Sequence, residues 1–577
     1  MNTSGKDSTD SLKDAIEIAG GKRRVDLLLK NARVINTFSG DVHKADVAVH
    51  NGRIVGFGSY GAKQSLDLKG GYLCPGFIDG HVHLESSMVK IPEFGRIVVP
   101  RGTTTVVIDP HEIANVLGMD GIRYMLSSSL DCVLGVYVML PSCVPATHLE
   151  TAGAELSGHD LSLLLNDERV LGLAEMMNYP GVIGCASEVL DKICIAKGKR
   201  IDGHAPLVTG KGLNAYVSAG IKSDHECTTV GEAREKLRSG MFIMIREGTA
   251  AKNLRALLPL VNSENSRKCL FVTDDRHLED IFKQGHMDHI VRSAIKLGVD
   301  PIRAIQMASI NAAEYFGLKD LGAVAPGYRA DLIVFDDLKR LKIAKVIKDG
   351  RLVAQDGVLL PSAASDYKGK VRGTINVRWI EHEDFAIKAE GKSARVISVI
   401  PNQIVTKGLV LPVKADGGFV SSDTGRDILK IAVIERHMAS GRIAKGLVKG
   451  FGLKKGAIAS SVSHDSHNIV VIGVHDSDMY TAAVQVVKMQ GGIVAACNGQ
   501  VLEALPLPVA GLMSDRSAEF VVENLRRLID AAHGMGSKLD DPYMAMSFLT
   551  LPPIPELKIT DRGIIDAVNF KVVPLFV

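Results

Sequence analysis

The sequence predicts an α/β fold built around a (β/α)8 barrel, with a small β-sandwich domain assembled from both flanks of the barrel and a C-terminal α+β domain. Short apolar runs alternate with helical stretches through the first half of the chain, which is typical of a barrel. Hairpin signals flank this region on both sides. The 577 residues are enough for about two to four domains.

Residues 1–74 are expected to form a short helix and the first part of the β-sandwich. Ser11, followed by Asp14, fits the start of a helix that runs through Ala19. Asn51-Gly52 stands between two apolar runs and is a strong signal for a tight hairpin. The candidate strands are Val25–Leu29, Ala45–His50 and Arg53–Phe57.

Residues 75–320 carry the alternating pattern of the predicted barrel. Its candidate strands are Phe77–Asp79, Thr104–Ile108, Val133–Leu140, Val170–Ala174, Arg200–Asp202, Gly220–Ser223, Phe242–Ile245 and Leu270–Thr273. Helical stretches between them include Ile113–Leu130, Pro180–Ala196 and Arg276–Leu297. Eight strand–helix repeats over roughly 240 residues are typical of a (β/α)8 barrel.

Residues 321–368 are expected to return to the β-sandwich, because Asp349-Gly350 separates two further short apolar runs. Residues 369–577 predict the α+β domain. Its expected elements are strands Ile428–Glu435 and Ile469–Val474, a helix from Ser477 or Asp478 to Met489, a hairpin at Asn498-Gly499, and a helix Ser517–Ala532 whose apolar face holds Phe520, Val521, Leu525, Leu528 and Ile529.

The overall composition excludes several classes of function. Net charge is only +3 on 68 basic and 65 acidic residues, so no basic field indicates nucleic-acid binding. The eight cysteines form no C-x-x-C pair, which argues against a zinc ribbon and fits a reducing cytosol. No apolar signal core begins the chain, and no apolar run reaches the roughly 18 residues that span a bilayer. A cytoplasmic protein without a membrane partner is expected.

The run that ends the first barrel strand carries the strongest chemical signal. His81 and His83 stand two residues apart, so in a strand their imidazoles point to the same face and reach one metal ion. Taken alone, the pair also fits a polar surface loop. Four further candidate ligands at corresponding strand ends favour a metal site, since the carboxyl ends of barrel strands meet at one face. They are Glu175, His204, His225 and Asp274.

This ligand set resembles that of the amidohydrolase superfamily, whose barrels hold one or two divalent metals. Within it, the chain is most similar to the bacterial adenine deaminases over nearly its whole length. Glu175 departs from the carboxylated lysine that many amidohydrolases carry on the fourth strand. The stretches that carry the resemblance are Pro75–Met88, Asp109–Gly118, Gly203–Pro206, Ser223–Glu226 and Thr273–Asp275.

The resemblance implies a dinuclear Mn²⁺ or Fe²⁺ centre and hydrolysis of adenine to hypoxanthine and ammonia in purine salvage. Zn²⁺ also suits nitrogen and carboxylate ligands without thiolate. A metal-bound hydroxide would attack the ring carbon that carries the amine. We expect Asp274 to ligate metal and accept the proton of the water, and Glu226, beside His225, to protonate a purine ring nitrogen.

Several polar residues near the strand ends are candidates for substrate contacts. They are Glu85, His111 and Glu112; the alternatives are that Glu85 holds a loop and that the other two open a helix. For Arg246-Glu247 we favour a salt bridge. For the cluster from His464 to His467 three alternatives stay open: it closes over the barrel mouth, lines a substrate loop or forms a polar turn.

Two other functions stay open at this stage. The same metal site would serve hydrolysis of another cyclic amide or amidine. A non-catalytic scaffold on the same fold is disfavoured, because such a scaffold is expected to lose metal ligands and all six are present. A homo-oligomer, dimer or larger, is expected.

Overall fold

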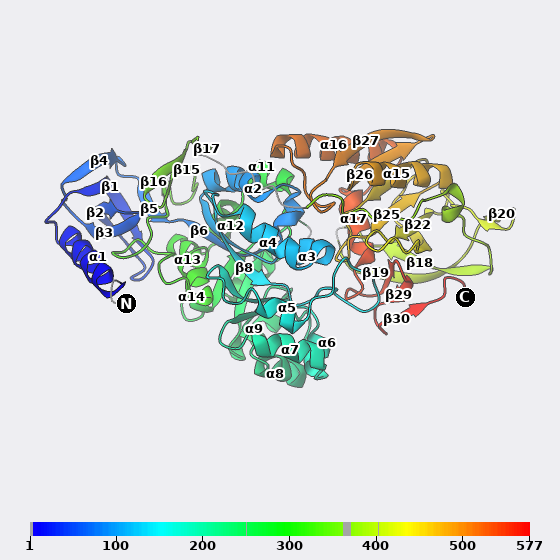
Figure 1. The fold of residues 1–577 in the computed structure, drawn as a ribbon, viewed down its shortest axis with the longest axis horizontal. Coiled ribbons are helices and arrows are strands. Elements are labelled where there is room, and N and C mark those ends of the chain that lie inside the picture. Colours follow the sequence, from blue (N-terminus) through cyan, green and yellow to red (C-terminus); the bar gives the residue numbers. More distant parts are fainter. Residues whose placement is uncertain (1–3, 250, 362–370, 402) are drawn as a thin grey trace.

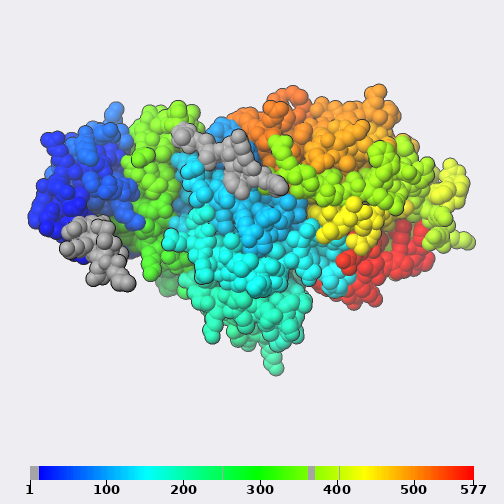
Figure 2. Space-filling model, in the orientation of Figure 1, coloured from blue at the N-terminus to red at the C-terminus, as the bar shows by residue number. Residues whose placement is uncertain are grey.

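The computed structural model of this protein describes residues 4–249, 251–361, 371–401 and 403–577. Three parts follow one another along the long axis of the molecule: the N-terminal β domain, the barrel and the C-terminal domain (Figure 1). The surfaces of the three parts are continuous with one another (Figure 2). The division of the chain at residues 74, 320 and 368 stays a prediction, and residue 368 lies outside the described residues.

Hydrogen bonds join strands from both flanks of the barrel into one nine-stranded sheet. The two flanks meet where Cys74 pairs antiparallel with Ile333. Asn51 and Gly52 both have positive φ, at 47° and 73°, as a tight hairpin requires. The strands are β1 (Val25–Asn36), β2 (Asp41–His50), β3 (Arg53–Phe57), β4 (Ala62–Asp67), β5 (Tyr72–Pro75), β14 (Leu332–Phe335), β15 (Ile343–Lys348), β16 (Arg351–Gln355) and β17 (Val358–Leu359).

The N-terminal helix α1 spans Ser4–Ala19. It ends at the predicted residue, but the prediction that it starts at Ser11 is wrong. Serine and aspartate are good capping residues, yet they are also tolerated on the exposed face of a helix. The capping signal at Ser11 therefore did not mark the first turn.

Eight parallel strands form the barrel. Pairing runs without a break from β6 to β10 and from β11 to β13. An isolated bridge between Val82 and Asp274 joins the first strand to the end of the last. The strands are β6 (Phe77–Val82), β7 (Thr103–Ile108), β8 (Gly135–Leu140), β9 (Val170–Met176), β10 (Arg200–Gly203), β11 (Ser223–Asp224), β12 (Phe242–Arg246) and β13 (Cys269–Val272).

Three stretches predicted as single helices are each broken in two. Gly118 has φ 57°, Cys185 has φ 58° and Gly285 has φ 112°, values that a right-handed helix does not allow. The resulting pairs are α3 (His111–Leu117) with α4 (Met119–Ser128), α6 (Tyr179–Ile183) with α7 (Ser187–Ile195), and α11 (Leu278–Gln284) with α12 (Met287–Lys296). The other helices of this half are α2 (Ile91–Val98), α5 (Gly158–Ser162), α8 (Gly210–Ser218), α9 (Val230–Arg238), α10 (Leu254–Leu257), α13 (Pro301–Met307) and α14 (Ile310–Phe316).

An eight-stranded sheet forms the centre of the C-terminal domain, in the order β19-β18-β23-β22-β25-β24-β26-β27. Asn498 and Gly499, with φ 54° and 70°, form the predicted hairpin turn. The strands are β18 (Ser393–Val399), β19 (Thr406–Pro412), β22 (Ile428–Ile434), β23 (Ile443–Lys449), β24 (Ala457–Ser460), β25 (Ile469–Gly473), β26 (Gly492–Cys497) and β27 (Gln500–Pro506). Smaller sheets are formed by β20 (Ala415–Asp416) with β21 (Phe419–Val420), and by β28 (Leu557–Thr560), β29 (Gly563–Asp566) and β30 (Lys571–Val573).

The helices of this domain are α15 (Asp476–Lys488), α16 (Ala518–Gly534) and α17 (Pro542–Ser547). Helix α15 begins at Asp476, so neither predicted cap residue precedes it. Ser517 does cap α16, since its hydroxyl accepts a hydrogen bond from Phe520 N at 3.3 Å. Phe520 itself is 36% exposed and does not share the buried face, because it lies in the first turn, where its ring is near the guanidinium of Arg516.

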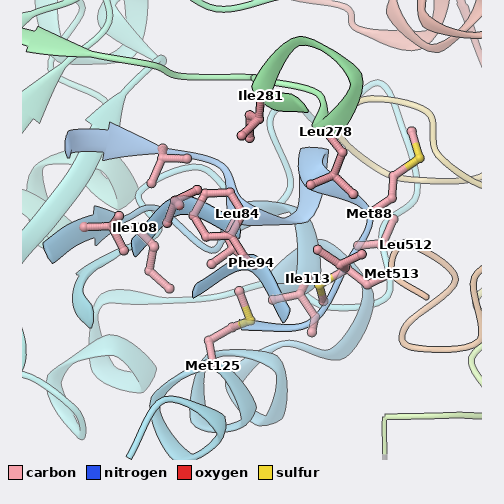
Figure 3. Packing of buried hydrophobic residues seen from close by; sticks show 14 of the residues in the cluster. Leu84, Met88, Phe94, Ile108, Ile113, Met125, Leu278, Ile281, Leu512 and Met513 are labelled. Atoms are coloured by element: carbon pink, nitrogen blue, oxygen red, sulfur yellow. The ribbon is translucent and has the colours of Figure 1, made fainter. Parts of the chain in front are cut away.

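The barrel and the C-terminal domain share one hydrophobic core. Leu512 and Met513 lie beside Leu84, Met88 and other barrel residues (Figure 3). The backbone N–H of the next residue, Ser514, donates to Met88 O at 2.7 Å. This contact joins the C-terminal domain to the barrel just beyond the carboxyl end of β6. Within the described part of the chain, no helix is both long and apolar enough to cross a membrane.

Candidate metal centre

The six predicted ligands meet at the carboxyl ends of five barrel strands. His81 is the penultimate residue of β6 and His83 follows the strand directly, while Glu175 is the penultimate residue of β9. The other three side chains, those of His204, His225 and Asp274, follow β10, β11 and β13. The side chain of His204 is the most exposed of the six, at 15%, and the other five are buried.

The two oxygens of Glu175 face different pairs of histidines. Oε1 lies 3.2 Å from His83 Nε2 and 3.9 Å from His81 Nε2. Oε2 lies 2.5 Å from His204 Nδ1 and 3.1 Å from His225 Nε2. A carboxylate placed in this way bridges two neighbouring subsites.

Asp274 completes the subsite of the first histidine pair. Its Oδ1 lies 3.3 Å from His81 Nε2 and 3.0 Å from His83 Nε2. The residue has φ 59°, a left-handed conformation that aspartate adopts more readily than most residues. In that conformation its backbone N–H donates to His81 O at 3.0 Å, which ties the last strand end to the first.

The ring nitrogens of the first pair are arranged in a way that suits metal binding. His83 Nδ1 lies 3.2 Å from Asp109 O, and only a protonated Nδ1 donates to a carbonyl. Nε2 donates to the two carboxylates here, and a metal that displaced its proton would meet the Nε2 lone pair in the same place, as in metal sites where a second hydrogen bond sets the tautomer. His81 Nε2 is buried and has no hydrogen-bond partner among the described residues. These residues fit a pair of divalent metal ions.

Arg246, at the end of β12, connects two acidic residues of the site. Its Nη1 lies 2.8 Å from Asp274 Oδ2 and also contacts Glu226 Oε1, and its Nη2 lies 3.2 Å from Glu226 Oε2. Arg246 forms the expected salt bridge, with Glu226 and Asp274 as partners, whereas Glu247 accepts a hydrogen bond from Leu254 N at 3.2 Å. Burial raises the pKa of Glu226, but the charges of Arg246, His204 and His225 together outweigh it and leave the pKa below its usual value. Glu226 is therefore ionised in this state.

The three candidate substrate residues occupy different positions. His111 and Glu112 line the same cavity as the predicted metal ligands. Glu85 Oε1 instead accepts a hydrogen bond from Ile113 N at 3.1 Å, at the start of α3. Burial, followed by the charge of Glu112, raises the pKa of Glu85 to about 7. This contact matches the loop-holding alternative, and a substrate contact of Glu85 stays a prediction.

The C-terminal domain supplies the far wall of this cavity, which has a volume of about 60 Å³. His464 Nδ1 lies 2.7 Å from Glu112 Oε1, and the ring stacks on Phe548 with centroids 4.7 Å apart. Burial lowers the pKa of His464, but Glu112 reverses the effect and raises it to about 9. The wall residues are Ile404, His464, Asp465, Phe548, Leu551 and Ile554. Of these wall residues, only His464 and Asp465 were signalled in the sequence, by the polar run that precedes the apolar strand β25.

His467 contacts the other oxygen of Glu112 through Nε2. Glu112, His464 and His467 are close enough to hold an ion, but the hydrogen bonding argues otherwise. His467 Nδ1 accepts the backbone N–H of Ser463 at 3.2 Å, so in the neutral ring the proton is on Nε2. Nε2 therefore carries its proton toward Glu112 Oε2, and the cluster is a polar link between the barrel and the C-terminal domain.

A barrel with these ligands at its strand ends defines a metal-dependent amidohydrolase. The model of the amidohydrolase family matches residues 72–353, and that of the adenine deaminase C-terminal domain matches residues 403–571. Adenine deaminase 2 of Carboxydothermus hydrogenoformans is 52% identical over 98% of this chain and 99% of its own. An adenine deaminase of Clostridium acetobutylicum is 48% identical over 97% of this chain and 99% of its own. The chain belongs to the adenine deaminase family.

Proposed function

We propose that this protein hydrolyses adenine to hypoxanthine and ammonia with two divalent metal ions at the barrel mouth. The observation that carries the proposal is the placement of Glu175, whose two oxygens face separate histidine pairs. Full-length relatives that carry the name adenine deaminase support the substrate. The reaction would serve purine salvage.

Each metal ion would have its own set of ligands. His81, His83 and Asp274 would hold one ion together with Glu175 Oε1. The second ion would be bound through Glu175 Oε2 by two further imidazoles, those of His204 and His225. Bound divalent ions lower the pKa of water from about 15.7 towards 7, which makes hydroxide available near neutral pH.

The acidic residues at the mouth would move the protons of the reaction. Asp274 is ionised, because burial is outweighed by Arg246 and the neighbouring histidines, so it is ready to accept the proton of the attacking water. Glu226 contacts the same Nη1 of Arg246 and is the nearest carboxylate for the next transfer. As an ionised group it must first gain a proton before it protonates a purine ring nitrogen.

The apolar part of the C-terminal wall would exclude water from the substrate. Phe548, Leu551 and Ile554 face the same cavity as the ligands. A dry site strengthens the electrostatic interactions of Asp274 and Arg246 with the reacting atoms.

The metal, the cellular location and the oligomeric state are also part of this proposal. Mn²⁺ or Fe²⁺ is the metal expected from the resemblance to adenine deaminases, and ligand atoms that are all nitrogen or oxygen also suit Zn²⁺. A cytoplasmic location is supported by the eight free cysteines. A homo-oligomer stays a prediction from the sequence, and light scattering would measure it.

The deciding experiment is ammonia release from adenine by protein expressed with iron chelated and manganese supplied. Bound metal would be counted per chain, and a panel of purines and other cyclic amidines would be tested in parallel. We expect about two metals per chain and release from adenine alone. Two bound metals with turnover of a different cyclic substrate would replace adenine in the proposal, and absence of metal would favour a scaffold.

A further inference from the structure

Asp465 is a buried carboxylate for which the described chain does not supply enough hydrogen-bond donors. It belongs to the C-terminal domain and is 3% exposed, yet it lines the cavity that holds Glu175 and His225. Its Oδ2 is buried and accepts no hydrogen bond from any described residue. Such an atom carries a desolvation penalty unless a ligand fills the missing bond.

The nearest donors to Asp465 are engaged elsewhere. Its Oδ1 lies 3.8 Å from both His111 Nε2 and His464 Nδ1, beyond hydrogen-bond distance. His464 Nδ1 is committed to Glu112 at 2.7 Å. Burial raises the pKa of Asp465 to about 6, so the carboxylate is still largely ionised at neutral pH. A hydrogen-bond donor of a bound molecule would therefore complete this position.

Asp465 lies on the same cavity as the metal ligands, on the far side of the His111 ring. His111 Nε2 faces Asp465, while His111 Nδ1 lies 3.6 Å from Glu175 Oε1. One imidazole ring thus separates Asp465 from the bridging carboxylate. Beside it, the stacked rings of His464 and Phe548, at an interplanar angle of 15°, offer a flat surface to a planar base.

Adenine has a donor that suits this position. When the amine-bearing carbon of its six-membered ring lies at the metals, its five-membered ring points away from them. In the free base that ring carries an N–H, whereas in a nucleoside or a 9-alkyl derivative it carries none. This argument rests on the proposed adenine deaminase function and adds the basis of its specificity.

We infer that Asp465 accepts the ring N–H of the five-membered half of adenine and thereby selects the free base against nucleosides. The C-terminal domain is then more than a cover for the barrel. The domain contributes the carboxylate of Asp465, which determines specificity. The contacts of Glu112 with His464 and His467 hold the loop that carries Asp465.

The test compares adenine with 9-methyladenine, which has no ring N–H in either half. The KM for adenine and the apparent inhibition constant of 9-methyladenine would be measured for wild type and Asp465→Ala, with both proteins loaded with manganese. We expect kcat/KM for adenine to fall roughly 10- to 100-fold, as for loss of a hydrogen bond to a charged group. The affinity for 9-methyladenine should stay constant or rise, because alanine leaves room for the methyl group.

Glu150→Gln is the matched control, since Glu150 is a buried acid close to Asp465 that does not line the cavity. Glu150→Gln should leave the ratio of the KM for adenine to the inhibition constant of 9-methyladenine unchanged. Equal losses for adenine and 9-methyladenine in Asp465→Ala, or no loss for adenine, would overturn the inference. Wild-type protein that binds two metals but does not deaminate adenine would instead refute the proposed function.

Discussion

Replacement of Glu175 by glutamine tests the bridging role on which the proposed function depends. The side chain keeps its size, but one oxygen becomes an amide NH₂ that has no lone pair for a metal. The contacts of Oε1 and Oε2 are to different histidine pairs, so whichever way the amide turns, one pair loses its shared ligand. The centre should therefore hold about one metal per chain instead of two.

The expected loss of metal affinity in Glu175→Gln follows from the negative charge that the substitution removes. The histidine nitrogens lie 2.5–3.9 Å from the two oxygens of Glu175, so a bound ion would be within about 4 Å of the carboxylate. A unit charge pair at 4 Å and an effective dielectric constant near 20 contributes about 4 kcal/mol. At about 1.4 kcal/mol per tenfold, Glu175→Gln should weaken metal binding by roughly 10³-fold.

The assay combines metal analysis after dialysis with ammonia release from adenine. Ammonia release should fall by at least the same factor as the metal occupancy of the subsite that loses its ligand. Burial raises the pKa of Glu150 to about 8, so this glutamate is mostly protonated at neutral pH and its amide is a close substitute. Glu150→Gln should retain two metals and normal turnover. If Glu175→Gln keeps two metals per chain and wild-type kcat, the bridging assignment is wrong.

Three further predictions address the proton transfers, the domain contact and the buried charge. Asp274→Asn should lower kcat by roughly 10²- to 10⁴-fold, as for loss of a general base, and unchanged ammonia release would exclude that role. Leu512→Ala should cost about 2–5 kcal/mol in urea unfolding and raise KM for adenine, because this side chain packs the C-terminal domain on the barrel. Leu447→Ala, inside the C-terminal domain, should destabilise without the KM change, and a matching KM rise would contradict the argument. Burial lowers the pKa of Lys558 to about 7, against roughly 10.4 in the unfolded chain, so above pH 7 the unfolded state binds more protons. Stability should then rise with pH between 7 and 10 by up to about 1.4 kcal/mol per unit, and Lys558→Met should abolish that contribution; equal slopes in both proteins would refute it.

Much of the fold was predictable because its signals are local. Asn51-Gly52 and Asn498-Gly499 demand positive φ, and both form the hairpins that they predict. The breaks at Gly118 and Cys185 were not predictable in the same way. Isolated residues of these types are tolerated inside helices, and only the packing of the flanking segments decides that the chain turns there.

The sequence by itself determined which side chains meet at the barrel mouth. His81 and His83 share a face because side chains in a strand alternate, and the carboxyl ends of barrel strands meet at one mouth. Both relations depend on position along the chain, so they can be inferred without coordinates.

Only the tertiary structure decided how those side chains are used. The two oxygens of Glu175 face different histidine pairs, and Arg246 connects Glu226 to Asp274. Asp465 reaches the same cavity from another domain, because Leu512 and its neighbours pack that domain against the barrel. Local patterns carry no information on such contacts, since they arise from the burial of apolar surfaces that lie hundreds of residues apart.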